Sequence, residues 1–158
     1  MPPENVNAAV NVILRCNRGV VEVLLIRRVT NPKDPWSGDI AFPGGRMEEE
    51  DKDFLETALR ETFEEVGIPK DKLEVIGVLD LAYTLAGVKY NVAPVVSRLK
   101  DEVPLNLGNE VEKAFWMPLS PMEEKKVIHP LRGVMVRAYI YEGEIIWGMT
   151  KRLSLIHI

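Results

Sequence analysis

The sequence predicts an α/β (α+β) fold, and three features lead to this prediction. β-Rich segments recur in pairs along the chain, with turn signals between the members of each pair. One amphipathic helix interrupts these segments, between Asp53 and Gly67. A second helical segment begins near Trp147. Many strands with a central and a terminal helix favour a layered architecture, and the length suits one domain, which we expect over residues 1–158.

The strands are predicted to form three hairpins. Their strands cover residues 6–16 with 20–26, 73–85 with 88–99, and 134–141 with 144–147, and their turns lie at Asn17-Arg18-Gly19, Ala86-Gly87 and Glu142-Gly143. Residues 31–39 and 100–109 are predicted loops. Residues 110–118 resemble a short helical turn that leads into a strand, and residues 120–130 are predicted as an exposed loop or a short helix. Pro94 lacks an N–H donor, so we expect it at a strand edge or a bulge.

The central helix has recognisable ends. Asp53 and Glu56 form a pair like a capping box, with Asp in place of the usual Ser or Thr. Gly67 suits the left-handed position just past a helix, and Pro69 blocks continuation of the helix. Before the helix, the sequence Phe-Pro-Gly-Gly at residues 42–45 predicts a tight loop where backbone can approach a ligand closely.

Three carboxylates lie on one face of this helix. Glu61, Glu64 and Glu65 fall within about 100° of each other at 3.6 residues per turn. The neighbouring stripe would face the core and contains Leu55, Leu59, Thr62 and Val66. A solvated acidic face is the simplest interpretation of such a set. However, like charges at this spacing repel, and a hard divalent cation such as Mg²⁺ would remove the conflict.

These residues together resemble the signature of the Nudix hydrolase family, G-x5-E-x7-R-E-U-x-E-E-x-G-U, where U is a bulky apolar residue. The matching residues are Gly45, Arg60-Glu61, Glu64-Glu65 and Gly67-Ile68. The run from Gly45 to Arg60 is one residue longer than the signature, which puts Asp51 at the first acidic position when counted from Gly45. Thr62 also replaces the first apolar residue.

Both departures are similar to one branch of the family, the coenzyme A diphosphatase-like group. That branch reads G-x3-FPGG, then an Asp, then T-A-L-R-E-T-x-E-E-x-G, as this chain does from Gly38 onward. The piece Trp147-Gly148-Met149-Thr150 is also similar to that branch. Residues 24–29 differ, because they read Leu-Leu-Ile-Arg-Arg-Val where the branch has L-L-T-x-R-S. Asp34 stands where a basic residue is expected, and its charge would repel the 3′-phosphate of coenzyme A.

The resemblance implies a Nudix α/β/α sandwich with a mixed central sheet, and it implies the site. Mg²⁺ or Mn²⁺ would be bound by Glu61, Glu64, Glu65 and the carbonyl of Gly45, with Arg60 holding the glutamates in place. The general base would be Glu61 as first choice and Glu110 as second. Substrate contacts are expected from Arg27, Arg28, Arg46, Gly44 and Gly45. For Arg27 and Arg28, a solvated strand end is the alternative interpretation.

The expected reaction is hydrolysis of the diphosphate bond of a nucleoside diphosphate that is linked to another moiety, as in coenzyme A or a derivative. Two alternatives stay open: an ADP-ribose or nucleoside-triphosphate diphosphatase, and a non-catalytic Nudix domain that only binds nucleotide. The intact carboxylates Glu61, Glu64 and Glu65 argue against the non-catalytic alternative. Since many Nudix proteins are dimers, a homodimer is a further expectation from the resemblance.

Composition restricts the other classes of function. The net charge of −4 argues against a nucleic-acid partner, which would favour a basic stripe. No apolar run reaches the length of a membrane span and no signal-peptide pattern opens the chain, so a cytoplasmic location without a membrane partner is expected. The single cysteine, Cys16, excludes an intramolecular disulfide and is predicted to be buried. His129 and His157 lack companions at metal-ligand spacing and are predicted to be structural.

Overall fold

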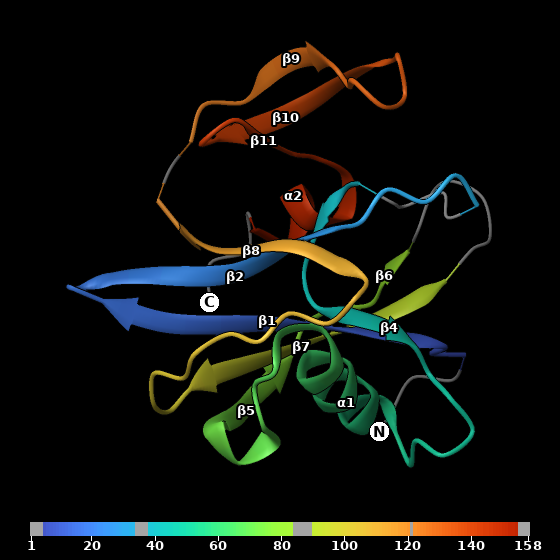
Figure 1. Ribbon diagram of the computed structural model, residues 1–158, viewed down its shortest axis with the longest axis vertical. Helices are drawn as coiled ribbons and strands as arrows, with labels where there is room; N and C mark the ends of the chain where they lie inside the picture. Colours follow the sequence, from blue (N-terminus) through green and yellow to red (C-terminus); the bar gives the residue numbers. More distant parts are fainter. Residues whose placement is uncertain (1–4, 34–37, 84–89, 121, 155–158) are drawn as a thin grey trace.

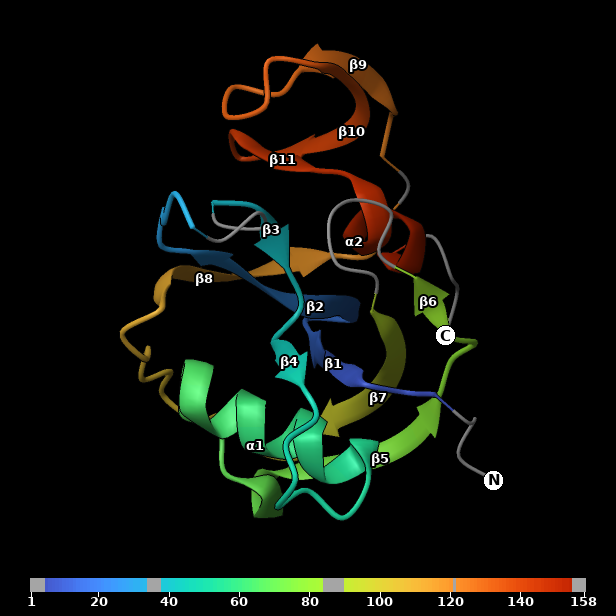
Figure 2. The ribbon, with the colours of Figure 1, turned by 90° about the vertical axis from the view of Figure 1, so that its right-hand side faces the viewer.

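The computed structural model describes residues 5–33, 38–83, 90–120 and 122–154 (Figure 1). A large mixed sheet lies between α1 on one side and a smaller sheet with α2 on the other, as Figures 1 and 2 both show. This is the layered arrangement predicted from the sequence. The elements are β1 Ala8–Asn17, β2 Val20–Arg28, β3 Ile40–Ala41, β4 Gly44–Arg46, α1 Phe54–Val66, η1 Lys70–Lys72, β5 Leu73–Val78, β6 Ala82–Tyr83, β7 Asn91–Leu99, β8 Val111–Pro118, β9 Lys125–Ile128, β10 Met135–Tyr141, β11 Glu144–Ile146 and α2 Gly148–Ser154.

The large sheet has the strand order β3-β2-β1-β7-β5, with β4 paired to β1, β6 to β7 and β8 to β2. Strands β1 and β7 are parallel, while β1 pairs with β2 and β5 pairs with β7 in antiparallel fashion. The first predicted hairpin is therefore confirmed, with Arg18 and Gly19 at positive φ in its turn. The third is also confirmed, because β10 and β11 pair around Glu142 and Gly143. The predicted turn at Ala86-Gly87 lies outside the described residues.

The core fills both faces of the large sheet because β1 and β7 are buried on both sides. Along β1, Val12 packs toward α2, β10 and β11, whereas Ile13 packs toward α1, as the alternation of a strand requires. Phe42 is buried among the same residues as Val12, on the side of the sheet that faces α2, β10 and β11. It is 1% exposed and anchors the loop before β4 in the core. Gly44 and Gly45, which were predicted in a loop, instead begin β4 and pair with Val10 and Ala9 of β1, so their backbone is held at a defined place.

The strand predicted within residues 110–118 is β8, which begins after a turn at Asn109 and Glu110 and pairs with β2 along most of its length. Three other local predictions were wrong. Residues 120–130 contain strand β9, which pairs with β10. Cys16 is exposed, since it lies near the tip of the β1–β2 hairpin, which extends beyond the layers that cover the sheet (Figure 1). Pro94 lies inside β7, between β1 and β5.

Pro94 is tolerated there because its neighbouring strand is interrupted. The backbone N–H of Leu79, which follows β5, donates to the Pro94 carbonyl at 2.9 Å. Within a strand the nitrogen of a residue points to the same side as its carbonyl. The missing donor of Pro94 therefore faces the break between β5 and β6 rather than a continuous ladder.

Polar contacts hold the smaller sheet against the large one. Asp39, just before β3, accepts hydrogen bonds from Arg132 at 2.6 Å and from the Trp147 indole at 3.4 Å. The Nε2 atom of buried His129 lies 3.1 Å from Asp39, and its Nδ1 atom accepts from the N–H of Leu131 at 3.2 Å. This is the structural role predicted for His129, while His157 lies outside the described residues. None of the described helices is long and apolar enough to cross a membrane.

Helix α1 begins and ends where the sequence predicts. The Asp53 side chain accepts from the N–H of Glu56 at 2.9 Å, but Glu56 in turn accepts from Lys52 at 3.3 Å, so the reciprocal half of the capping box is shifted by one residue. Gly67 has φ 76° and donates to the Phe63 carbonyl. The following loop packs against this end, since the N–H of Asn106 donates to the Val66 carbonyl at 2.9 Å.

Replacement of Gly67 by Ala should lower the free energy of unfolding by about 1–2 kcal/mol, the usual cost of a left-handed L-residue. The new Cβ would also lie 2.8 Å from the Cβ of Asn106, which adds a steric cost. Gly77→Ala is the matched control, because no atom lies within 4 Å of its added Cβ. Urea unfolding of both variants measures the difference, and equal stability of the two would contradict the prediction.

Candidate metal and diphosphate site

The first two residues of β4, Gly44 and Gly45, lie close to α1. The N–H of Gly44 donates to Glu65 Oε1 at 2.8 Å. A Cβ on Gly44 would lie 2.3 Å from the carbonyl oxygen of Ala9, and a Cβ on Gly45 would lie 2.7 Å from the Glu61 carboxyl carbon. Neither position therefore has room for a side chain, which explains the two glycines and places backbone beside two of the carboxylates.

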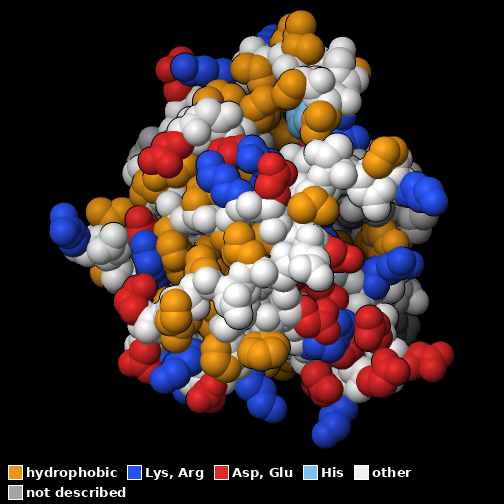
Figure 3. Space-filling view, in the orientation of Figure 1, with side chains coloured by type: hydrophobic (Ala, Val, Ile, Leu, Met, Phe, Trp, Pro, Cys, Tyr) orange, Lys and Arg blue, Asp and Glu red, His pale blue; other side chains and the backbone are white. Residues whose placement is uncertain are grey.

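The three carboxylates differ in exposure and have arginine partners. The side chains of Glu61, Glu64 and Glu65 are 16%, 55% and 5% exposed. Arg60 Nη1 lies 2.9 Å from Glu61 and 3.3 Å from Glu64. Arg28 Nη1 lies 3.3 Å from Glu65 Oε2. Acidic and basic side chains are accordingly intermingled over α1 and the loop that precedes it (Figure 3).

Burial makes two of these carboxylates hard to ionise. Loss of solvent raises the pKa of Glu65 to about 7, although the charge of Arg28 and the hydrogen bond from Gly44 oppose the rise. Burial also raises the pKa of Glu61, against the opposing effect of Arg60. Glu65 Oε2 accepts no hydrogen bond. A positive charge placed among these oxygens would therefore stabilise their ionised forms.

Asp51 has a role that its place in the sequence did not reveal. Its two carboxylate oxygens accept from Arg60 Nε and Nη2, both at 3.0 Å, and Thr57 adds a hydrogen bond of 2.9 Å. The hydrogen bonds from Arg60 lower the pKa of Asp51 from 3.8 to about 2. Asp51 thus fixes the guanidinium that in turn contacts Glu61 and Glu64.

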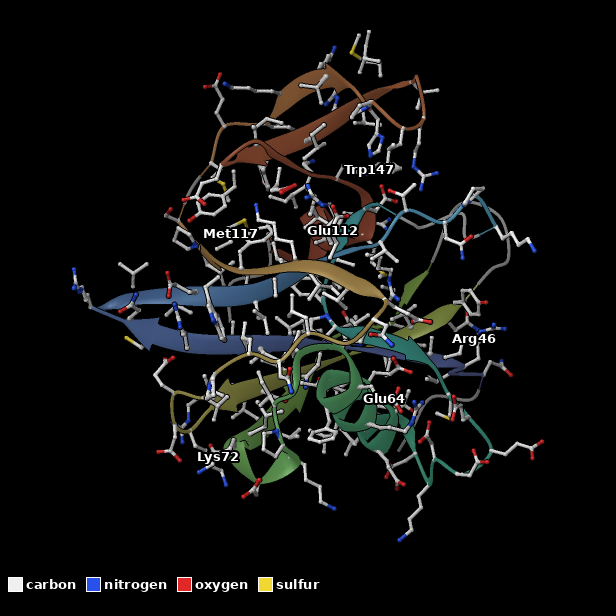
Figure 4. All side chains as sticks on the ribbon, in the orientation of Figure 1. Arg46, Glu64, Lys72, Glu112, Met117 and Trp147 are labelled. Carbon is white, nitrogen blue, oxygen red and sulfur yellow. The ribbon has the colours of Figure 1, made fainter. Side chains whose placement is uncertain are left out.

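Arg27 and Arg28 point to opposite faces of the large sheet. Arg28 reaches the Glu65 side and also donates to the Gly44 carbonyl at 2.9 Å. Arg27 instead donates to Glu144 at 2.7 Å and lies 3.5 Å from Glu112. Figure 4 shows Glu112 on the side of the sheet away from Glu64. The structure therefore does not bring Arg27 to the carboxylates of α1, because adjacent residues of a strand alternate between faces.

Arg27 belongs to a different environment. It lines a cavity of about 380 Å³ between the large sheet and the β10–β11 hairpin, together with Thr30, Glu112, His129 and Glu144. Glu144 is buried and is also contacted by Lys113 at 3.0 Å. Two carboxylates thus neutralise Arg27, and this geometry gives no support to the predicted phosphate contact of Arg27 at the carboxylates of α1.

Arg46, a predicted substrate contact, and Glu110, the second candidate for the general base, lie at the border of the site. Arg46 is on β4, its carbonyl accepts from Arg60 at 3.2 Å, and its guanidinium lies 5.9 Å from the Tyr90 ring (Figure 4). Glu110 is exposed just before β8, and its charge contributes to the raised pKa of Glu65. Glu110 is therefore near enough to Glu65 to act on the same site.

These residues suit a hard divalent cation in chemical type. Carboxylate and backbone carbonyl oxygens are the ligands that such ions prefer, and Glu65 Oε2 is buried without a hydrogen bond. Among the described residues, no three His, Cys, Asp or Glu side chains are grouped closely enough to hold a metal as they stand. The ion pairs with Arg28 and Arg60 are the physical reason, because each carboxylate is directed toward a guanidinium.

Comparison with known proteins identifies the family. The NUDIX domain model matches residues 5–139. The chain belongs to the Nudix family. An uncharacterized Nudix hydrolase NudL from Escherichia fergusonii is 39% identical over 121 residues, which are 72% of this chain and 62% of that protein. The chain thus spans about 62% of the length of the curated relatives that it matches.

Solved structures of Nudix proteins have the same fold. A binary complex of a C. elegans Ap4A hydrolase is 26% identical with a TM-score of 0.61, and the match covers 72% of this chain and 80% of that one. The Nudix domain of Shewanella oneidensis NrtR, complexed with ADP ribose, is 20% identical with a TM-score of 0.55, covering 74% and 75% of the two chains. The predicted α/β class and mixed sheet are therefore confirmed.

The structure explains why this Nudix signature tolerates Thr62 at an apolar position. Thr62 is fully buried, donates to the Ala58 carbonyl at 2.7 Å and accepts from the Asn11 amide at 3.0 Å. Sequence reasoning missed this pair, although a polar residue within the apolar strand at residues 6–16 was an available signal. This hydrogen bond fixes α1 against β1 and so determines where Glu61 and Glu65 lie relative to Gly44 and Gly45.

Replacement of Asp51 by Asn should lower the free energy of unfolding at pH 7 by about 1.5–3 kcal/mol, the range for hydrogen bonds to charged groups. Because the pKa of Asp51 is lowered to about 2, its carboxylate stabilises the fold fully above pH 3.8, and this effect is lost as the pH falls toward 2. The stability difference between wild type and Asp51→Asn should therefore shrink over that interval.

Urea titrations at pH 2, 3, 4 and 7 measure this dependence. Asp101→Asn is the control, since Asp101 is 66% exposed and its contact with Lys72 is 3.5 Å, so its effect should stay below about 1 kcal/mol. A difference for Asp51→Asn that does not change with pH would contradict the assigned role of the carboxylate.

Proposed function

We propose that this Nudix domain is a metal-dependent hydrolase that cleaves the diphosphate bond of a nucleoside diphosphate derivative. The observation that carries the proposal is the group Glu61, Glu64 and Glu65 beside the Gly44–Gly45 backbone, with two of the three carboxylates largely withdrawn from water. Such carboxylates have little structural reason to lie next to each other on α1. A non-catalytic domain that only binds nucleotide would not need them.

Glu61, Glu64, Glu65 and the Gly45 carbonyl would hold Mg²⁺ or Mn²⁺. A bound ion of this kind neutralises charge on phosphoryl oxygens and lowers the pKa of its bound water. Arg60 positions Glu61 and Glu64, and Asp51 positions Arg60.

The remaining chemistry needs a base and phosphate contacts. Glu61 is the first candidate to take the proton of the attacking water, because burial raises its pKa toward the range in which a carboxylate is an effective base. Glu110 is the second candidate. Arg28 and Arg46 carry the positive charge next to the Gly44–Gly45 loop and are the proposed substrate contacts.

Coenzyme A or a derivative is the substrate that we propose, on the branch-like spacing from Gly38 to Arg60 and on Trp147-Gly148-Met149-Thr150. ADP-ribose or a nucleoside triphosphate is the alternative. The structurally similar Nudix domain of NrtR is complexed with ADP ribose, which is the reason to test ADP-ribose as a substrate here. Asp34, whose charge argues against coenzyme A, lies outside the described residues. The homodimer, the single domain over residues 1–158 and the cytoplasmic location stay predictions.

Turnover of coenzyme A, dephospho-coenzyme A and ADP-ribose by the same protein, with Mg²⁺, tests the substrate. We expect coenzyme A to be cleaved with the highest kcat/KM and all turnover to stop with a chelator. Efficient cleavage of ADP-ribose with almost none of coenzyme A would reject the branch assignment and retain the hydrolase. Nucleotide binding without any turnover would favour the non-catalytic alternative.

Replacement of Glu64 by Gln should lower kcat by about 10²-fold or more, in the range seen when one group that stabilises the transition state is lost. The melting temperature should change little, because the Glu64 side chain is 55% exposed. Glu56→Gln is the matched control on the same helix, since Glu56 contacts Lys52 at the helix start. If Glu64→Gln keeps most of the wild-type rate, the assignment of the carboxylates is wrong.

A further inference from the structure

Arg28 makes two contacts with the candidate metal site. Its Nη2 atom donates to the carbonyl oxygen of Gly44 at 2.9 Å, and its Nη1 atom lies 3.3 Å from Glu65 Oε2. Gly44 in turn donates its N–H to Glu65 Oε1 at 2.8 Å. Arg28, Gly44 and Glu65 therefore form a closed ring of contacts that joins β2, β4 and α1.

The two oxygens that Arg28 covers are of the kind that a divalent cation takes, one from a buried carboxylate and one from a backbone carbonyl. The contact to Glu65 is an ion pair without a hydrogen bond, since Oε2 accepts none. Arg28 is 23% exposed while Glu65 is 5% exposed, so the guanidinium has a path to solvent and the carboxylate does not. A cation that binds Glu65 must therefore compete with the Arg28 guanidinium, which can move away into solvent.

We propose that Arg28 and the divalent cation are alternative partners of Glu65. Two positive groups at the same carboxylate repel each other, so the guanidinium would leave Glu65 when a cation is bound there. Arg28 is then a placeholder that compensates the buried carboxylate until the cation arrives. The released guanidinium, tethered at the end of β2, is available to a substrate phosphate, which it matches in geometry.

This inference rests on the proposed function, because it assumes that Glu65 is a metal ligand. It adds a property that the proposed function does not require: Arg28 should oppose metal binding. A residue that merely supported the site, or that helped to bind the metal, would have the opposite effect when removed.

Arg28→Met tests the inference through metal binding rather than turnover. Mn²⁺ titration calorimetry at pH 8.5, where competing protons are few, gives the dissociation constant, and thermal unfolding is recorded with EDTA and with saturating Mn²⁺. In EDTA the melting temperature of Arg28→Met should fall, because Glu65 loses its counter-charge. The Mn²⁺-induced rise should exceed that of wild type, and the dissociation constant should fall about tenfold, which corresponds to about 1.4 kcal/mol.

Arg15→Met is the matched control for loss of an ion-paired arginine. Arg15 is 19% exposed and lies 2.8 Å from Glu22, near the far end of β1. Its replacement should lower the melting temperature in EDTA and leave the Mn²⁺ dissociation constant unchanged. Arg28→Lys keeps the charge but has no planar fork to hold two oxygens, so it should tighten Mn²⁺ binding by a smaller factor, and it serves as the test if Arg28→Met does not fold.

The outcomes separate the two claims. If wild type binds Mn²⁺ and Arg28→Met binds it equally or more weakly, the exchange at Glu65 is rejected while the hydrolase stands. If wild type neither binds Mn²⁺ nor turns over any diphosphate, the proposed function fails and the inference fails with it. At saturating Mn²⁺, Arg28→Met should also raise KM for the diphosphate substrate about tenfold, and an unchanged KM would reject the contact between the released guanidinium and phosphate.

Discussion

The hydrogen bond from the Gly44 N–H to Glu65 is the contact on which the candidate site depends. It joins the loop to α1 at a place where two glycines leave no room for side chains. Phe42 holds the loop in the core, and the Asn11–Thr62 pair holds the helix against β1. The distance between the loop and the carboxylates is therefore set by packing on both faces of one strand, β1.

Charge balance is the second constraint, and it follows from burial. Carboxylates brought out of water need a positive partner, and here arginines supply it. Arg60 serves Glu61 and Glu64, and is itself held by the two oxygens of Asp51. Arg28 serves Glu65. Each guanidinium also donates to a backbone carbonyl of β4, Arg28 to Gly44 and Arg60 to Arg46, so the two arginines join β4 to the helix.

On the side of the large sheet away from α1, charged residues connect the two sheets instead of surrounding the candidate site. Arg27, Glu112, Lys113 and Glu144 form an ion-paired group that connects the large sheet to the β10–β11 hairpin. Asp39, the last residue before β3, contacts Arg132, His129 and Trp147, which all come from the C-terminal third of the chain. These contacts attach the smaller sheet to the large one. Charged residues of the large sheet, such as Arg27, therefore find their partners in the last third of the sequence.

Local signals were sufficient for the elements that are encoded within a few residues. The caps at Asp53 and Gly67 and the turns at Gly19 and Gly143 could be predicted because each depends on neighbouring residues only. Strand β9 could not, since its sequence has ambiguous periodicity and becomes a strand by pairing with β10. The short strands β3, β4 and β6 likewise exist only through their partners.

The sequence by itself determined that α1 carries three carboxylates on one face and that a glycine loop precedes it, because helical spacing and turn chemistry are local properties. Tertiary structure alone decided which charged residues meet them. Arg27 and Arg28 are adjacent and chemically identical, yet only Arg28 faces Glu65. The choice is made by the register of β2 in the large sheet, which decides which of two adjacent side chains faces α1. A shift of one residue exchanges the two faces of a strand, and no pattern within the strand itself specifies that shift.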